Sequence, residues 1–224
     1  MATNPLWDNL VACYDLDDET DSTSSGYTLT NNNSVTFSTG LIGNVGSFSK
    51  ASSKYLSRTD NADLSVNSDY TVSVWVKLTS YDTTGQTLVA KRSGTGCEYA
   101  INHVDSGPTE KFVVQIATSA GSCSFFQTLD SSDLGNTPRS WAHVLWRWSS
   151  SSLATSLWVN GVQEDSDTAT GSIADGATAF TIGALATPTF YLDGEIDSTM
   201  VFKRAVTDVE ISTLYNAGSG LACP

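Results

Sequence analysis

The sequence predicts an all-β fold, a sandwich of two antiparallel sheets (a jelly roll) with one short helix near the C-terminus. Short runs in which apolar and polar side chains alternate recur along the chain, and this period of two is typical of half-buried strands. Gly, Asn, Asp and Ser residues separate the runs, as they do in turns. The length of 224 residues fits one large β domain, because such domains reach roughly 200–250 residues. We therefore expect residues 1–224 to form a single sandwich domain.

The clearest strand is DYTVSVWVKLTS at 69–80, in which every second residue from Tyr70 to Leu78 is apolar. The run WAHVLWRWS at 141–149 places Trp146 and Trp148 on one face, and one of its two faces must belong to the core. Further strand-like runs lie at 10–17, 86–92, 98–104, 111–118, 124–129, 156–163, 178–185 and 198–205.

Two local patterns indicate where elements turn or end. The pair Asn160-Gly161 supplies the positive φ angles of a type I′ turn and predicts a tight hairpin. The segment TDVEISTLYNAG at 207–218 predicts the helix, because Thr207 and Glu210 form a capping-box pattern and Gly218 suits the position after the last turn. The expected apolar stripe of this helix is Val209, Ile211, Leu214 and Tyr215.

The charge balance excludes two classes of partner. The chain has 11 Lys and Arg residues against 24 Asp and Glu residues, a formal net charge of −13. Nucleic-acid binding needs basic patches, and an anionic membrane surface would repel this chain. The same acidity has two interpretations: self-repulsion that keeps the protein soluble, or carboxylates gathered for a hard cation such as calcium.

Residue usage favours an extracellular or virion surface. Charged residues make up 16% of the chain, below the roughly 25% of an average globular domain, and Ser, Thr, Asn and Gly take up the polar share. No segment reaches the roughly 18 apolar residues that span a bilayer. The first residues, MATNPLWDNL, lack the basic and apolar regions of a signal peptide. Either a signal was removed, or the protein leaves the cell without one, as a virion component released by lysis would.

The four cysteines are Cys13, Cys97, Cys123 and Cys223, and none has the C-x-x-C spacing of a zinc or redox site. Cys97 and Cys123 lie in neighbouring strand-like runs, whereas Cys13 and Cys223 lie near the two ends of the chain. Pairing 97 with 123 and 13 with 223 would staple one hairpin and close the chain ends. The alternative is four free, buried thiols.

Six short segments, in order, resemble the laminin-G-like jelly-roll domains of the concanavalin A-like lectin/glucanase superfamily over residues 10–220. They are LVACYDLDDETDSTSSG, GLIGNVGSFSKASSKYL, DYTVSVWVKL, WAHVLWRW, LWVNGV and FYLDGEIDSTMVFKRAVTDVEISTLYNAGSG. No single segment is specific, but six in the right order are. The resemblance implies two curved sheets and chain ends that lie close together, in keeping with a Cys13–Cys223 bond. It also implies a non-catalytic role in binding glycans or proteins, often with a calcium ion.

The acidic loop after the first strand is the expected calcium site. Five carboxylates lie between Asp15 and Asp21, and the resemblance makes the first and last strands neighbours, which would bring Asp197 to this loop. Carboxylates so crowded repel one another unless a cation lies between them, and calcium takes roughly six to eight oxygen ligands. We expect Asp17 and Asp197 as ligands, with Asp15 and Asp21 behind them. The alternative is a solvated acidic loop.

The segment YLDGEIDSTMVF at 191–202 is similar to the strand on which sandwich-fold glycosidases carry their carboxylates. Retaining enzymes need two carboxyl groups about 5–5.5 Å apart, but Thr199 stands where the acid/base would be, two residues beyond Asp197. We therefore expect no catalytic residues, and a glycoside hydrolase is the less favoured alternative. We expect His143 to be a satisfied inner-sheet histidine rather than a general base. As a strand, the segment would place Glu195, Asp197 and Thr199 on one face and Ile196, Ser198 and Met200 on the other.

Exposed aromatic rings are the expected glycan contacts. Most strand tryptophans should belong to the core, whereas Tyr81, Phe190 and Tyr191 fall near loop ends and are the candidate ligand-binding residues. The sequence therefore favours a non-catalytic binding or adhesion module that recognises a glycan or another protein, with a structural calcium. The alternative is a virion decoration or fibre protein without a glycan ligand. Both interpretations allow a homo-oligomer.

Overall fold

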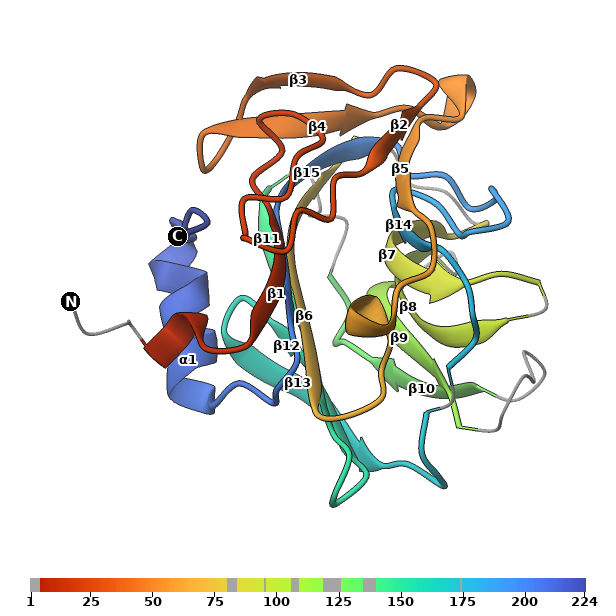
Figure 1. Ribbon diagram of the computed structural model, residues 1–224, viewed down its shortest axis with the longest axis vertical. Helices are drawn as coiled ribbons and strands as arrows, with labels where there is room; N and C mark the ends of the chain where they lie inside the picture. The colour runs from red at the N-terminus through yellow and green to blue at the C-terminus, as the bar shows by residue number, and fades with distance from the viewer. Residues whose placement is uncertain are drawn as a thin grey trace.

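The structure is a computed structural model that describes residues 5–79, 84–94, 96–105, 109–118, 126–134, 140–173 and 175–224. Within these residues the chain forms an antiparallel sheet of eight strands, sheet A, and another of seven strands, sheet B. The two sheets lie face to face as a sandwich, and the helix lies outside sheet A (Figure 1). The all-β sandwich and its short C-terminal helix are therefore confirmed.

The strand order of sheet A is β13-β12-β11-β6-β15-β4-β3, with β1 paired to β15, and that of sheet B is β10-β9-β8-β7-β14-β5-β2. Sheet A contains β1 (Leu10–Tyr14), β3 (Thr36–Thr39), β4 (Asn44–Phe48), β6 (Tyr70–Leu78), β11 (Ala142–Ser149), β12 (Ala154–Val159), β13 (Val162–Thr168) and β15 (Gly194–Phe202). Sheet B contains β2 (Thr30–Asn32), β5 (Tyr55–Arg58), β7 (Gln86–Arg92), β8 (Cys97–Asp105), β9 (Glu110–Ala117), β10 (Phe126–Asp130) and β14 (Phe180–Ile182). The helices are α1 (Asp208–Tyr215) and the 3-10 turns η1 (Pro5–Trp7), η2 (Lys50–Ser52), η3 (Ala62–Leu64) and η4 (Asn216–Gly218).

The main core lies between the sheets and is built by the predicted alternation. The apolar face of β6, from Tyr70 to Leu78, points into it together with Trp146 and Trp148 of β11. The ring of Trp146 lies 4.8 Å from that of Tyr99, on the opposite sheet. These large rings carry much of the hydrophobic stabilisation, because burial contributes about 25 cal/mol per Å² of apolar surface.

A second apolar cluster lies between sheet A and α1. Ile211 and Leu214 of the helix pack there with Leu145 and Phe202 of the sheet. Val209, predicted in the same apolar stripe, is instead 76% exposed. The helix has only two turns, so one narrow face covers the sheet and Val209 lies on the other side.

Both ends of α1 are built by local hydrogen bonds. The predicted capping box is confirmed: the Thr207 hydroxyl accepts from the Glu210 amide at 3.3 Å, and the Glu210 carboxylate accepts from the Thr207 amide at 2.7 Å. The Arg204 guanidinium beside Glu210 lowers the pKa of that carboxyl to about 2. The end of the helix was predicted wrongly, because Asn216 rather than Gly218 takes the left-handed C-cap position, with a φ of 48°. Asparagine tolerates that conformation.

The Asn160-Gly161 hairpin is confirmed, with φ angles of 51° and 76° and with Val159 paired to Val162. The predicted alternation along β15 is wrong beyond Asp197. Ile196 belongs to the core between the sheets, whereas Met200 belongs to the cluster under α1. A β-bulge between Asp197 and Met200 causes the change, because an inserted residue moves every later side chain to the other face.

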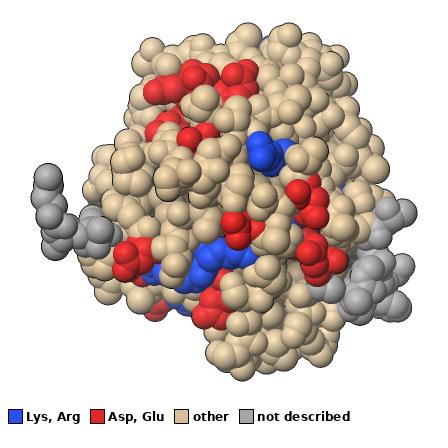
Figure 2. Space-filling view, viewed as in Figure 1, with Lys and Arg blue, Asp and Glu red and all other residues tan. Residues whose placement is uncertain are grey.

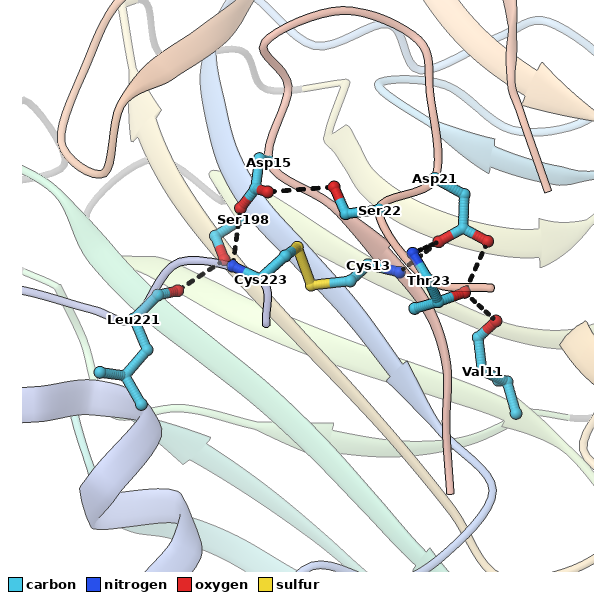
Figure 3. Close-up of a disulfide and its surroundings, with 9 residues drawn as sticks. All are labelled: Val11, Cys13, Asp15, Asp21, Ser22, Thr23, Ser198, Leu221 and Cys223. Carbon is cyan, nitrogen blue, oxygen red and sulfur yellow. Dashed lines mark hydrogen bonds between the residues drawn. A yellow bond between two sulfur atoms is a disulfide. The ribbon is translucent and has the colours of Figure 1, made fainter. Parts of the chain in front are cut away.

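The two ends of the chain lie together, as the resemblance implies. A disulfide joins Cys13 of β1 to Cys223, with their Cα atoms 5.8 Å apart (Figure 3). Cys97 is also disulfide-bonded, and its predicted partner, Cys123, lies outside the described residues. Within the described part of the chain, no helix has the length and apolar character needed to cross a membrane.

Candidate ligand-binding site

The outer face of sheet B, which points away from sheet A, carries a pocket of about 200 Å³. Its floor comes from three adjacent strands, β7, β8 and β9, whose inward residues Ile101 and Val114 belong to the core. Because side chains alternate along a strand, Asn102 and Gln115 point outward instead. The topology thus brings two amide side chains, 13 residues apart in the sequence, to one spot.

The polar floor is held in one arrangement by its own hydrogen bonds. The Thr87 hydroxyl donates to Asn102 Oδ1 at 3.0 Å, and Asn102 Nδ2 donates to Gln115 Oε1 at 3.3 Å. Arg92 Nη1 also donates to Gln115 Oε1. Partial burial lowers the pKa of the Arg92 guanidinium, which nevertheless stays charged in proteins. This preorganisation matters because groups that are already oriented lose little entropy when a ligand binds.

An aromatic wall is supplied by the loop that follows β14. Phe190 lines the pocket and is 47% exposed. Its backbone has a φ of 53°, and its carbonyl accepts from the Thr87 amide at 2.8 Å, which fixes the loop to the edge of β7. Gly85 also lines the pocket, and a Cβ atom there would lie 3.8 Å from the Phe190 ring. The result is one apolar ring facing a set of amide and guanidinium groups.

The chemistry of this pocket suits a small neutral molecule with one apolar face and several hydroxyl groups. Side-chain amides both donate and accept hydrogen bonds, and the guanidinium donates several in one plane. A sugar ring has this character, since its C–H face is apolar and its hydroxyls lie at the edge. Pockets that bind small molecules combine apolar walls with a few fixed polar groups in the same way.

The three aromatic residues predicted as ligand contacts have different places. Phe190 lines the pocket. Tyr191 is half-buried beside Tyr55, with ring centroids 6.1 Å apart. Tyr81 lies outside the described residues. Asn102, Gln115 and Arg92 were not predicted as site residues, and their signal in the sequence is only a polar residue at an outward position of a buried strand.

A larger groove of about 670 Å³ crosses the outer face of sheet A, and its lining includes Arg147, Gln163 and Asp167. Among the described residues that line it, none is aromatic. Arg147 is already engaged there, with Nη1 2.6 Å from the Asp208 carboxylate and donating to the Val206 carbonyl at 3.0 Å. Of the two hollows, the pocket at Phe190 therefore offers the better combination of apolar and polar groups.

The acidic loop between β1 and β2 gathers negative charge on one surface, at the top of the view in Figure 2. Asp21 is buried, and both of its oxygens accept bonds from within the loop: Oδ1 from the Cys13 and Thr23 amides, each at 3.0 Å, and Oδ2 from the Tyr27 amide at 2.9 Å. The bonds from Cys13 and Thr23 to Asp21 close the loop around its own backbone (Figure 3). Asp21 is thus a backbone cap.

The other predicted metal ligands lie apart from Asp21. Asp15 accepts from the Cys223 amide at 2.8 Å and from the Ser22 hydroxyl at 3.1 Å (Figure 3). Asp17 is exposed and accepts from the Asn44 amide at 3.2 Å. Of the described residues, no three of the four predicted ligands bring carboxylate oxygens within 4.8 Å of one another.

Asp197 is wholly buried, and its two oxygens differ. Oδ2 accepts from the Ile42 amide at 2.7 Å and from the Leu41 amide at 3.1 Å, whereas Oδ1 has no hydrogen-bond partner. Burial raises the pKa of this carboxyl to about 7, and the nearby negative charge of Asp15 adds to the effect. An unpartnered buried carboxylate oxygen is the one feature of the four residues that fits a cation ligand.

The residues that a glycosidase would use do not form a catalytic pair. Glu195 lies 3.1 Å from Lys77 in an ion pair, while Asp197 and Thr199 are wholly buried. His143 was predicted on the inner side of its sheet, but it lies on the outer side, with its ring tilted against Trp75 and stacked on Tyr215 of α1. Its Nε2 is 2.7 Å from the Ser73 hydroxyl, its Nδ1 has no partner, and burial lowers its pKa to about 3.

The fold defines a class of proteins, the jelly-roll β-sandwiches. A family model described as the concanavalin A-like lectin/glucanases superfamily matches residues 48–212, more than half of the chain. The chain therefore belongs to this superfamily, in its laminin-G-like branch. No curated protein sequence matches the chain.

Solved structures with the same fold include two binding domains and one domain of an arabinanase. The binding domain of Paraclostridial Mosquitocidal Protein 1 matches with a TM-score of 0.73 and 18% identity, over 95% of this chain and 53% of that one. The binding domain of botulinum neurotoxin DC, in complex with SialylT, matches with a TM-score of 0.72 and 14% identity, over 95% and 52%. This chain thus spans about half the length of those toxin chains.

The third structure is domain 4 of AbnA, a GH43 extracellular arabinanase from Geobacillus stearothermophilus, in complex with arabinotriose. It matches with a TM-score of 0.66 and 21% identity, over 92% of this chain and 97% of that one. At these identities the likeness establishes the fold alone.

Proposed function

We propose that this protein is a non-catalytic module that binds a neutral oligosaccharide in the pocket at Phe190. The observation that carries the proposal is an exposed aromatic ring that lines the same pocket as Asn102, Gln115 and Arg92, whose side chains are already fixed by hydrogen bonds. A sugar would stack its C–H face on Phe190 and direct its hydroxyls to the amides and the guanidinium.

The structural match to the arabinanase domain supports the same proposal. That domain matches this chain over nearly its whole length and was solved with arabinotriose. Arabinotriose is therefore a rational first probe. The toxin domains match over about half of their chains, so their ligands carry less weight for this one.

The proposal is tested by a glycan array followed by titration calorimetry with the best glycan, starting from arabinotriose. Phe190→Ala should weaken binding at least about tenfold, since central contacts contribute more than about 1.4 kcal/mol each. Val209→Ala is the matched control, because Val209 is an exposed apolar residue on α1, outside this pocket. If the wild type, Phe190→Ala and Val209→Ala bind the glycan equally tightly, the binding site lies elsewhere.

We also propose a structural calcium ion with Asp197 and Asp15 as its carboxylate ligands. The unpartnered Oδ1 of Asp197 and the electrostatic coupling between the two residues support this choice. Asp17 is a weaker candidate because it is exposed, and Asp21 is a weaker one because both of its oxygens already accept backbone amides. Calcium would hold Asp197 in its charged form and tie β15 to β1.

We place the module on an extracellular or virion surface. The disulfide between Cys13 and Cys223 supports an oxidising compartment. A protein ligand and a virion structural role are the outcomes favoured if no glycan binds in the array. Co-purification with a capsid, tail or cell-surface protein would then identify the partner.

A further inference from the structure

A lysine and two carboxylates meet beneath the segment that joins β5 to β6. Lys91, on β7, is wholly buried, and its Nζ lies 2.5 Å from Asp60 Oδ1 and 3.3 Å from Glu98 Oε1. Nζ also donates to the Thr178 carbonyl at 2.8 Å. Nothing in the binding function proposed above uses these groups.

The three side chains come from three different segments of the chain. Asp60 lies just before η3, in the segment that runs along the side of the sandwich from β5 to β6 (Figure 1). Glu98 is the second residue of β8, which pairs with β7. The fold thus presents one amine to one carboxyl group, with a second carboxyl group beside both.

Glu98 is held rigidly and away from water. Its side chain is wholly buried, Oε2 accepts from the Val66 amide at 2.8 Å, and Oε1 accepts from the Gly176 amide at 3.3 Å. Burial raises the pKa of this carboxyl. Its Oε1 lies 3.3 Å from Lys91 Nζ, close enough to accept a proton from the amine.

Asp60 is placed as the electrophile. Its Oδ1 touches Lys91 Nζ, so its Cγ atom is one covalent bond away from the contact. An attack by nitrogen on Cγ needs the two atoms about 3–3.5 Å apart, and the contact between Nζ and Oδ1 brings them towards that separation. Part of the Asp60 side chain, 35%, is exposed, which leaves a path for a small leaving group.

We propose that Lys91 and Asp60 form an intramolecular isopeptide bond, an amide between Nζ of the lysine and Cγ of the aspartate, with Glu98 as the proton carrier. Glu98 takes a proton from the ammonium, and the free amine attacks Cγ. Of the three ammonium protons, one stays on the amide nitrogen. The other two leave with one Asp60 oxygen as water, delivered through Glu98. The step needs no oxidant and no co-reactant, since an ammonium and a carboxylate give an amide and one water.

The bond would fasten the β5–β6 segment to sheet B, just as the disulfide fastens the C-terminus to β1. A covalent link of this kind restricts the unfolded chain and resists pulling apart under load. It would suit an adhesion module exposed outside the cell.

The test is the intact mass of the full chain after reduction of its disulfides. The wild-type protein is expected to be one water lighter than its sequence mass, and Asp60→Ala is expected to have its full sequence mass. Asp175→Ala is the matched control, because Asp175 belongs to the same acidic group but makes no bond to Lys91 among those described. It should keep the mass loss.

Digestion with trypsin locates the bond. The amide blocks cleavage after Lys91, so a branched peptide that joins residues 59–77 to residues 78–92 is expected. A folded Glu98→Gln variant should keep its full mass, and a water loss in that variant would overturn the role given to Glu98. A wild-type protein at full sequence mass, or a water loss that persists in Asp60→Ala, would overturn the bond itself.

Discussion

Replacing Asp197 with asparagine should remove a loss of stability that the wild-type protein shows as pH rises through neutrality. Asp197 is wholly buried on β15, and burial raises its pKa from 3.8 to about 7. The amide bonds from Ile42 and Leu41 act in the opposite direction but do not cancel the cost of burial. Asparagine has nearly the same shape and can accept the same bonds from Leu41 and Ile42, but it does not ionise.

The sign and the size follow from the two pKa values. Between 3.8 and about 7 the folded protein holds a proton on Asp197 that the unfolded chain has released. The free energy of unfolding therefore falls by about 1.4 kcal/mol for each pH unit in that window. From about pH 5 to about pH 7 the sum is about 2 kcal/mol, since the folded carboxyl is half ionised at the upper limit. Below pH 3.8 Asp197 causes no loss of unfolding free energy, and above about pH 7 the loss that it causes is complete.

Two histidines change the unfolding free energy in the opposite direction with pH. Their contribution must be separated from that of Asp197. Burial lowers the pKa of His103 to about 4 and that of His143 to about 3, from an ordinary 6.5. Below about pH 6.5 the unfolded chain binds protons that the folded protein excludes, so these residues make stability rise with pH up to that value. They are present in both proteins, and the difference between wild type and Asp197→Asn isolates Asp197.

The assay is urea unfolding of both proteins at several pH values from about 5 to about 7, in the presence of a chelator. The difference in unfolding free energy should change by about 2 kcal/mol across the series. Parallel stability profiles would refute the reasoning. Adding calcium should then restore the lost unfolding free energy of the wild-type protein, because a bound cation stabilises the carboxylate. Calcium should not change the unfolding free energy of Asp197→Asn. If calcium changes neither protein, the proposed site is absent.

Three further changes test the fold by chemical denaturation. Replacing Cys13 and Cys223 together with alanine should cost about 5 kcal/mol, because the bond spans 210 residues, and a loss under about 1 kcal/mol would contradict the chain-entropy argument. Gly194→Ala should cost about 1–3 kcal/mol, since the new Cβ would lie 2.5 Å from the Lys77 carbonyl oxygen, and an unchanged midpoint would show that the strands can separate there. Thr207→Ala should cost about 1 kcal/mol and Thr207→Ser much less, and equal losses would argue against the capping role.

The strands could be predicted because each carries its own signal. The alternation from Tyr70 to Leu78 fixed which face is buried, and Asn160-Gly161 fixed a turn through its own backbone preference. The bulge after Asp197 left no such signal. It depends on how β15 meets β1 and β6, and it reversed the predicted positions of Met200 and its neighbours.

The candidate site was predictable only in part. Phe190 could be placed near a surface because it lies in a loop, but its partners Asn102 and Gln115 come together only through strand pairing. The acidic loop shows the opposite difficulty. A carboxylate that caps backbone amides, as Asp21 does, has the same sequence signature as one that binds a metal, because both kinds of partner satisfy the same oxygen atoms.

The most direct test of the binding role is titration of the protein with arabinotriose and with the glycans that an array selects, in wild type, Phe190→Ala and Val209→Ala. The account predicts saturable binding by the wild type, the same binding by Val209→Ala, and binding at least about tenfold weaker by Phe190→Ala. A wild-type protein that binds no glycan, or a Phe190→Ala variant that binds as tightly as the wild type, would contradict it.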